Sequence, residues 1–229
     1  MGTVILLRHA RSAANGSGTL AGRTPHVELD DAGREQAVGL IGRLSAVPLS
    51  GLVRSPMLRC EQTVSALAAE RSLETVVEPD LSEVDYGEWT GKQLADLVSE
   101  PLWRVVQAHP SAAVFPGGEG LAQVQARSVA AVRRHDERIT AQAGEDAVWL
   151  LCSHGDVIKS VLADALGQHL DAFQRIVVDP GSISVVRYTS LRPFVLRLND
   201  NAGDLTSVVP PPRERVADSD APVGGSTGS

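Results

Sequence analysis

The chain has 229 residues, of which 43% are hydrophobic and 21% charged, and its formal net charge is −7. This composition is typical of a soluble globular protein, and the acidic balance argues against a nucleic-acid-binding protein, which usually has a basic surface. No stretch approaches the roughly 20 apolar residues of a membrane span, and the first apolar run ends at Arg8, too early for a signal peptide. We therefore expect a cytoplasmic protein that binds neither nucleic acid nor membranes.

The first predicted element is a strand over residues 3–7, an unbroken apolar or β-branched run. Such a run predicts a strand buried on both faces, as in a parallel sheet. Arg8 and His9 follow it directly and would lie at the carboxyl end of the strand, where open α/β sheets bind ligands. Residues 16–22 predict a flexible loop. Its glycines stand too far beyond the strand to form a dinucleotide-binding turn.

A helix capped by Asp30 comes next, and a short strand over residues 51–53 leads to a second helix. Ser55 as N-cap and Pro56 in the first helical position predict where this second helix begins. Arg59 lies in its opening turn, where free N–H groups and a guanidinium together bind a phosphate well. The alternative for Arg59 is a solvated surface position.

The middle of the chain predicts a functional loop and a small helical lid. A strand over residues 74–77 precedes the loop 81–91, which mixes acidic, aromatic and glycine residues. A possible phosphate-binding glycine loop at 87–93 has the wrong spacing and is rejected. Two short helices over 92–99 and 101–108 form the lid, and a long helix begins at about residue 121. Trp89, Trp103 and Phe115 are candidates for an apolar cover over the site or for packing within the lid.

A second fully apolar strand, residues 147–152, ends in Ser153-His154-Gly155 and is followed by a helix over 157–166. Two buried strands would thus each bring a histidine to the same edge of the sheet. Cys60 and Cys152 both lie in apolar segments, which suits reduced thiols in the cytosol. Residues 182–188 and 194–198 predict a β-hairpin.

These elements predict a three-layer α/β/α fold with a mostly parallel central sheet, one antiparallel edge hairpin and a small helical lid insertion. One catalytic domain would span residues 1–207. Residues 208–229 have almost no apolar content and predict a disordered tail, because they cannot bury enough surface to offset the entropy of ordering.

The chain resembles the histidine phosphatase superfamily in its phosphoglycerate mutase-like branch. The matching stretches occur in the family's order and span roughly residues 3 to 200. Ala10 replaces the glycine of the family's first motif and keeps a small residue there. The stretches are Arg8-His9-Ala10 with Asn15, residues 29–37, residues 55–63 with Arg59, residues 83–91, and Ser153-His154-Gly155.

The resemblance implies His9 as the nucleophile that forms a phosphohistidine, with its tautomer set by a backbone carbonyl. It implies Glu83 as the acid that protonates the leaving alcohol and then helps water attack, so that a raised pKa is expected. It implies no metal and no cofactor, and the alternative of His9 and His154 as metal ligands lacks further ligands at suitable spacing.

The remaining residues implied by the resemblance would hold the substrate. Arg8, Arg59 and His154 would surround the phosphoryl group and stabilise its charge in the transition state. The other predicted substrate contacts are Asn15, Gly155 and Tyr86.

We predict a phosphomonoester hydrolase acting on a small phosphorylated metabolite. The alternative is a cofactor-dependent phosphoglycerate mutase. Two positions argue against a mutase: family mutases carry an arginine where this chain has Val84, and a pair of arginines in the insertion where this chain has only Arg104. Tyr86 and Lys92, in contrast, are compatible with a mutase. A catalytically idle protein that binds phosphorylated ligands or a partner is the third candidate, and a homodimer through an edge strand is also open.

Overall fold

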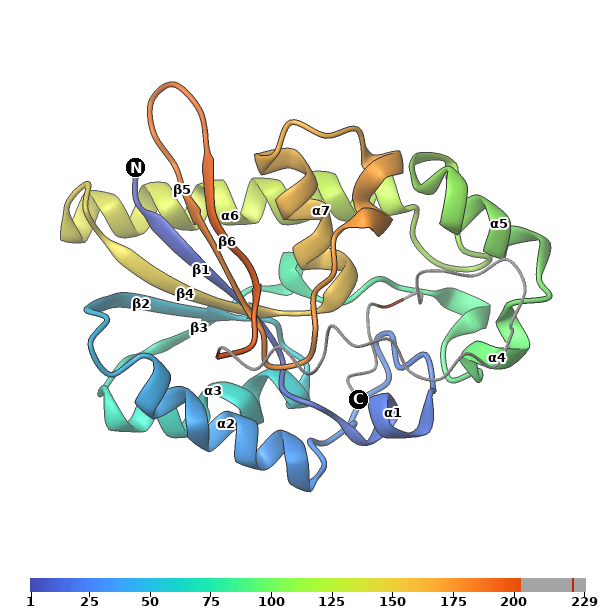
Figure 1. Cartoon of the computed structure of the whole chain (residues 1–229), viewed down its shortest axis with the longest axis horizontal. Helices are drawn as coiled ribbons and strands as arrows, with labels where there is room; N and C mark the ends of the chain where they lie inside the picture. The colour runs from blue at the N-terminus through green and yellow to red at the C-terminus, as the bar shows by residue number, and fades with distance from the viewer. Residues whose placement is uncertain (203–223, 225–229) are drawn as a thin grey trace.

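Six strands form one sheet in the order β3-β2-β4-β1-β5-β6 in the computed structural model, which describes residues 1–202 and 224 (Figure 1). The four strands from β3 to β1 pair in parallel, whereas β5 pairs antiparallel with both β1 and β6. The predicted mostly parallel sheet with an antiparallel edge hairpin is confirmed. The strands are β1 Thr3–Arg8, β2 Leu49–Arg54, β3 Thr75–Val77, β4 Val148–Ser153, β5 Ile183–Arg187 and β6 Phe194–Asp200.

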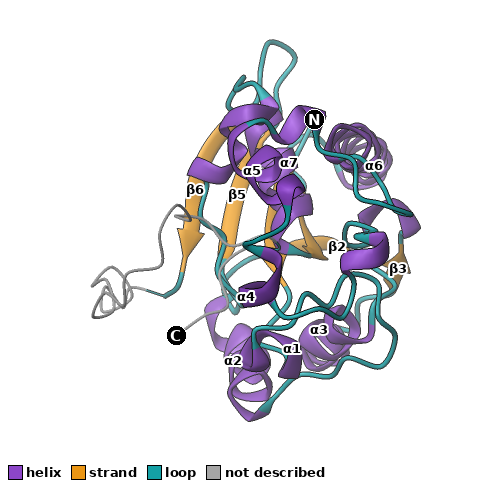
Figure 2. Ribbon diagram, turned by 90° about the vertical axis from the view of Figure 1, so that its right-hand side faces the viewer, coloured by secondary structure: helices purple, strands orange, loops and turns teal. Residues whose placement is uncertain are grey.

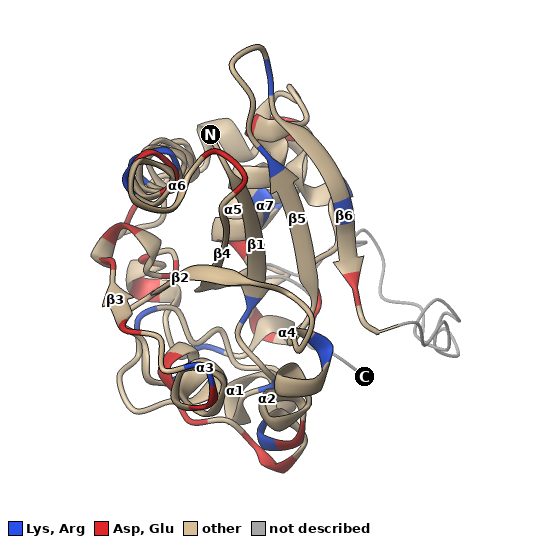
Figure 3. Ribbon diagram, turned by 90° about the vertical axis from the view of Figure 1, so that its left-hand side faces the viewer, with Lys and Arg blue, Asp and Glu red and all other residues tan. Residues whose placement is uncertain are grey.

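Helices cover both faces of this sheet, as Figure 2 shows with the strands between two helical layers. The helices are α1 Ala13–Ser17, α2 Asp31–Arg43, α3 Leu58–Glu70, α4 Leu94–Leu97, α5 Pro101–Ala108, α6 Leu121–Ala143 and α7 Gly155–Ala165. Short 3₁₀ turns occupy Pro79–Leu81, Gly87–Trp89, Pro110–Ala112 and Leu170–Arg175. Basic and acidic residues are mixed along α2 and α6 in Figure 3.

The side chains of β1 point alternately to the two faces of the sheet, and both faces are buried. Val4 and Leu6 belong to the core under α6 and α7, whereas Ile5 and Leu7 belong to the core under α2 and α3. The side chains of successive strand residues point to opposite faces, so an unbroken apolar run supplies both cores at once. This burial fixes the end of β1 rigidly at the carboxyl edge of the sheet.

The helix caps were predicted with mixed success. Asp30 caps α2 and accepts a hydrogen bond from the Gly33 amide at 2.8 Å, as predicted. The predicted N-cap at Ser55 is wrong, because α3 begins at Leu58 with Met57 as its N-cap. Residues 16–22 are not simply a loop, since α1 ends at Ser17 and begins with Ser12 in a capping box.

The predicted lid helices are present as α4 and α5, and their aromatic residues serve packing. Trp89, Trp103 and Phe115 are buried. Trp89 stacks on Trp103 with ring centroids 6.3 Å apart and contacts Phe115 edge-on at 5.4 Å. They hold the insertion together rather than covering the site.

No helix within residues 1–202 has the length and apolar content needed to cross a membrane. The predicted domain end at residue 207 and the predicted tail 208–229, apart from Gly224, lie outside the described residues.

Candidate active site

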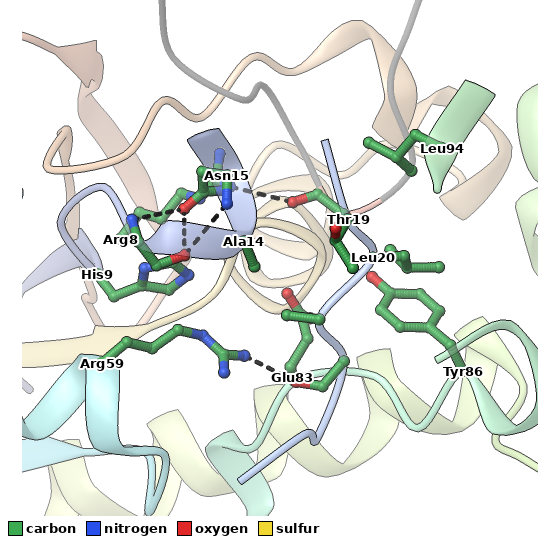
Figure 4. A pocket seen from close by; sticks show the side chains of 14 residues that line it. Arg8, His9, Ala14, Asn15, Thr19, Leu20, Arg59, Glu83, Tyr86 and Leu94 are labelled. Carbon is green, nitrogen blue, oxygen red and sulfur yellow. Dashed lines mark hydrogen bonds between the residues drawn. The ribbon is translucent and has the colours of Figure 1, made fainter. Parts of the chain in front are cut away.

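The carboxyl end of β1 lines a small pocket, and the carboxyl end of β4 lies beside β1. Arg8 is in register with Ser153, and the His9 amide donates to the Ser153 carbonyl at 2.9 Å, so the two predicted histidine-bearing ends are neighbours. The pocket, shown in Figure 4, takes its lining from β1, α1, α3, α4 and the loop after β3. The predicted site residues that line it are Arg8, His9, Asn15, Arg59, Glu83 and Tyr86.

His9 has the chemical state of a nucleophile. Its Nδ1 lies 2.8 Å from the Ala10 carbonyl oxygen, which only accepts, so Nδ1 carries the proton and Nε2 keeps its lone pair. Burial, and then the positive charges of Arg59 and Arg8, hold the pKa of His9 well below its ordinary value. The imidazole is therefore neutral near pH 7 and held in one tautomer by the backbone.

Two buried arginines stand beside His9. Arg8 is 1% exposed and Arg59 is 2% exposed, which is rare for a charged side chain without a bound anion or partner. Arg8 donates through Nη1 to the Val178 carbonyl at 2.7 Å, and Arg59 donates through Nη2 to the Gly22 carbonyl at 2.8 Å. Guanidinium groups suit a phosphoryl group, because their planar fork of N–H donors matches its oxygens.

His154 lies behind His9 rather than in the pocket lining. The two rings meet edge-on with centroids 5.2 Å apart, and His154 is fully buried. Arg59 Nη2 donates to His154 Nδ1 at 3.1 Å, so the Nε2–H of the neutral ring donates to Ser55 Oγ at 2.7 Å. Burial, followed by the charge of Arg59, holds the pKa of His154 well below its ordinary value. In this arrangement His154 orients Arg59.

Two of the other three predicted substrate contacts, Asn15 and Gly155, differ in their placement. Asn15 lines the pocket, and its Oδ1 accepts from the Ser12 amide at 3.0 Å and from Ser12 Oγ at 2.8 Å. Its Nδ2 amide is then the donor suited to a substrate oxygen. Gly155 opens α7 directly after His154 and is outside the pocket lining.

Glu83 is a buried carboxyl at the pocket wall. Burial, and then the negative charge of Asp156, raise the pKa of Glu83 to about 7. Its Oε1 accepts a hydrogen bond from the Val84 amide at 2.9 Å, and the charges of Arg59 and Arg8 limit the rise in pKa. A carboxyl with this pKa can both give and take a proton near neutral pH.

An ion-pair cluster that the sequence reasoning missed holds the Glu83 loop. Arg23 donates to the Glu83 carbonyl and to Glu119 Oε2, both at 2.9 Å. Arg127 forms a two-pronged pair with Glu119 at 2.9 and 3.0 Å. The Asp85 amide also donates to Glu119 Oε2 at 3.0 Å. Charge-assisted bonds of this kind fix the position of a loop.

Asp156 is a second residue that the sequence reasoning missed. It is fully buried, and its Oδ2 accepts from the Tyr86 hydroxyl at 2.8 Å. Lys159 Nζ lies 3.8 Å from its Oδ1. The available signal was its place two residues after His154, at the start of a helix where acidic residues are favoured.

Gly224 completes the lining of the pocket. Its carbonyl accepts from Arg8 Nη2 at 3.3 Å and its amide donates to Asp156 Oδ2 at 3.2 Å. Within the described part of the chain, no group of three or more His, Cys, Asp or Glu side chains is placed to hold a metal ion.

Comparison with known proteins places this site in context. The family model of the histidine phosphatase superfamily (branch 1) matches residues 4–201. Phosphoserine phosphatase 1 of Hydrogenobacter thermophilus is 30% identical over 199 residues, which are 86% of this chain and 91% of that protein. The adenosylcobalamin/alpha-ribazole phosphatase of Escherichia coli is 27% identical over 189 residues, 79% of this chain and 87% of its own.

Solved structures share the fold. A mycobacterial glucosyl-3-phosphoglycerate phosphatase in complex with VO3 has a TM-score of 0.77 at 24% identity, covering 86% of this chain and 98% of that one.

Proposed function

Because the chain belongs to the histidine phosphatase superfamily (branch 1), we propose that it hydrolyses the phosphomonoester of a small metabolite through a phosphohistidine on His9, without a metal ion. The observation that carries this proposal is the neutral His9, fixed by the Ala10 carbonyl, between two buried arginines and beside Glu83. The relatives of this chain include several proteins named as phosphatases of small metabolites.

In the first step, His9 Nε2 attacks phosphorus while the ester P–O bond breaks. Arg8 and Arg59 stabilise the charge on the equatorial phosphoryl oxygens, which is the main task in phosphoryl transfer. Glu83, which the raised pKa keeps largely protonated up to about pH 7, gives its proton to the departing alcohol oxygen.

In the second step, water attacks the phosphohistidine. The Glu83 carboxylate left by the first step takes a proton from that water, the N–P bond breaks, and inorganic phosphate leaves. His9 returns to its neutral form and Glu83 to its acid form, so the cycle closes without another reactant. His154 acts in both steps by holding Arg59.

The structure gives the mutase alternative little support. Val84 is fully buried in the core under α6 and α7, so it does not reach the pocket. Lys92 and Arg104 are exposed and outside the pocket lining. Val84 and Arg104 are the positions at which the chain departs from the mutase pattern, and Lys92 is the possible contact to a carboxylate. Tyr86, the other mutase-compatible residue, does line the pocket.

The test is release of phosphate from p-nitrophenyl phosphate in the presence of EDTA. The proposal expects turnover by the native protein and loss of at least about a thousandfold in His9→Ala. Equal rates in both proteins contradict it. Incubation with 3-phosphoglycerate and a trace of 2,3-bisphosphoglycerate tests the mutase, which rapid formation of 2-phosphoglycerate would establish.

We also propose a cytoplasmic location, supported by the free buried thiols of Cys60 and Cys152. Homodimer formation stays a prediction. Its relevant feature is the edge strand β6, on which Phe194, Leu196 and Leu198 are exposed at alternating positions. Light scattering of the purified protein measures the oligomeric state directly.

A further inference from the structure

Ser55 is a fully buried polar residue directly after β2, outside the lining of the pocket. Arg54 is in register with Cys152 on β4, and the Ser55 amide donates to the Cys152 carbonyl at 2.9 Å. This pairing brings the Ser55 side chain to His154, which lies two positions after Cys152. Because α3 begins only at Leu58, the hydroxyl does not cap that helix, and its oxygen contacts the histidine instead.

Arg59 fixes the direction of each hydrogen bond between itself and Ser55. An arginine side chain only donates, so His154 Nδ1 must accept the bond of 3.1 Å from Arg59 Nη2. The neutral ring then carries its proton on Nε2 and donates it to Ser55 Oγ at 2.7 Å. Ser55 Oγ also accepts from the Met57 amide at 3.3 Å, which holds the oxygen in place. Cys60 Sγ lies 3.6 Å from the same Nε2, but sulfur is a weak acceptor.

Arg59 is held by two acceptors through one nitrogen. Its Nη2 donates to the Gly22 carbonyl at 2.8 Å as well as to His154 Nδ1. One acceptor alone would let the guanidinium turn about that bond, whereas two acceptors fix its plane. The plane decides how the planar fork of N–H donors meets the oxygens of a phosphoryl group at His9.

The Ser55 hydroxyl is what keeps the His154 ring in this state. Without it, the buried Nε2–H of His154 would lose its oxygen acceptor, which is unfavourable. The ring can relieve this only by turning or by moving its proton to Nδ1. Either change takes the Nδ1 lone pair away from Arg59.

We propose that Ser55 is a positioning residue of the reaction: by accepting the Nε2 proton of His154, it keeps the Nδ1 lone pair on Arg59 and so fixes this guanidinium for the phosphoryl group. The inference rests on the proposed phosphatase function and deepens it. It gives His9 and His154 opposite tautomers, because the Ala10 carbonyl holds the His9 proton on Nδ1.

Nitrogen NMR of the native protein with ¹⁵N-labelled histidine tests the tautomers. The signals of the two rings are assigned by their disappearance in His9→Ala and His154→Ala. We expect the proton of His154 on Nε2 and that of His9 on Nδ1. A native His154 that carries its proton on Nδ1 overturns the inference, whether or not the Ser55 variants fold.

A double-mutant cycle tests whether Ser55 acts through His154. Ser55→Ala should lower kcat/KM for p-nitrophenyl phosphate at least about tenfold, because Arg59 is no longer held in one plane. In the His154→Ala background the same substitution should change kcat/KM by less than about twofold, since the residue through which Ser55 acts is gone. An equal loss in both backgrounds overturns the inference.

Ser184→Ala is the matched control. Ser184 is also buried, and its hydroxyl accepts from the Asn199 amide at 3.1 Å, but it is outside the pocket lining. We expect kcat/KM within about twofold of the native value. A loss as large as that of Ser55→Ala would show a general effect of removing a buried hydroxyl and would overturn the inference.

The outcomes separate this inference from the function on which it rests. An active native protein whose Ser55→Ala variant is equally active overturns the inference alone. No hydrolysis of p-nitrophenyl phosphate by the native protein overturns the proposed function and this inference with it.

Discussion

Replacing Glu83 with glutamine should stabilise the fold at pH 8 and should do so much less at pH 5. The carboxyl is buried beside Asp156, and its pKa rises from 4.5 to about 7 on folding. A group whose pKa is higher in the folded state favours folding through its protonated form. Its full contribution is present below pH 4.5 and is lost as the pH rises through 7.

The size of the effect follows from the same pKa values. Each factor of ten in proton affinity corresponds to 1.36 kcal/mol. The raised pKa of Glu83 therefore lowers the free energy of unfolding by about 3 kcal/mol at pH 8 and by about 1 kcal/mol at pH 5. Glutamine cannot ionise, and its amide oxygen can still accept the hydrogen bond from the Val84 amide. The variant therefore avoids the cost at high pH.

Urea unfolding of the native protein and Glu83→Gln at pH 5 and pH 8 measures this difference. Glu145→Gln is the matched control, because it removes an equal charge from an exposed position and should change stability by less than about 0.5 kcal/mol at either pH. If Glu83→Gln is no more stable than the native protein at pH 8, the argument that burial raises the pKa of Glu83 is refuted.

Three further predictions concern activity. EDTA should leave hydrolysis of p-nitrophenyl phosphate unchanged, because His9 and the buried arginines supply the chemistry; phosphate release is the assay. Hydrolysis of alkyl phosphates should fall as the pH rises above about 7, because Glu83 loses the proton that the leaving group needs. In a pH–rate profile, Asp156→Asn should move that decline to lower pH, since Asp156 raises the pKa of Glu83. The control substrate p-nitrophenyl phosphate should show no such decline, because its leaving group needs no proton. Glu119→Gln should lower kcat about tenfold by loosening the Glu83 loop, with the melting temperature measured alongside to identify a merely unfolded protein.

The sequence was most informative where chemistry follows a buried strand. Arg8 and His9 follow the apolar run of β1, and because that run is buried on both faces their position at the sheet edge was predictable. Glu83 was placed by the resemblance of its loop to a family motif, but its raised pKa depends on Asp156, a residue 73 positions later in the chain.

Contacts between distant segments could not be predicted from local patterns. Ser55 has the local signature of a helix cap, yet its hydroxyl binds His154, 99 residues away, and α3 starts three residues later. Likewise, the sequence around His154 does not indicate that its two ring nitrogens contact Arg59 and Ser55. The tertiary structure decides which of several available partners a polar side chain takes.

Trapping the covalent intermediate tests the central claim most directly. Native protein mixed with a phosphomonoester and quenched in base, which preserves phosphohistidine, should yield by mass spectrometry one added phosphoryl group on His9. His9→Ala should yield none and should release no phosphate. Turnover of the native protein with no label on His9, together with full activity in His9→Ala, would contradict the account.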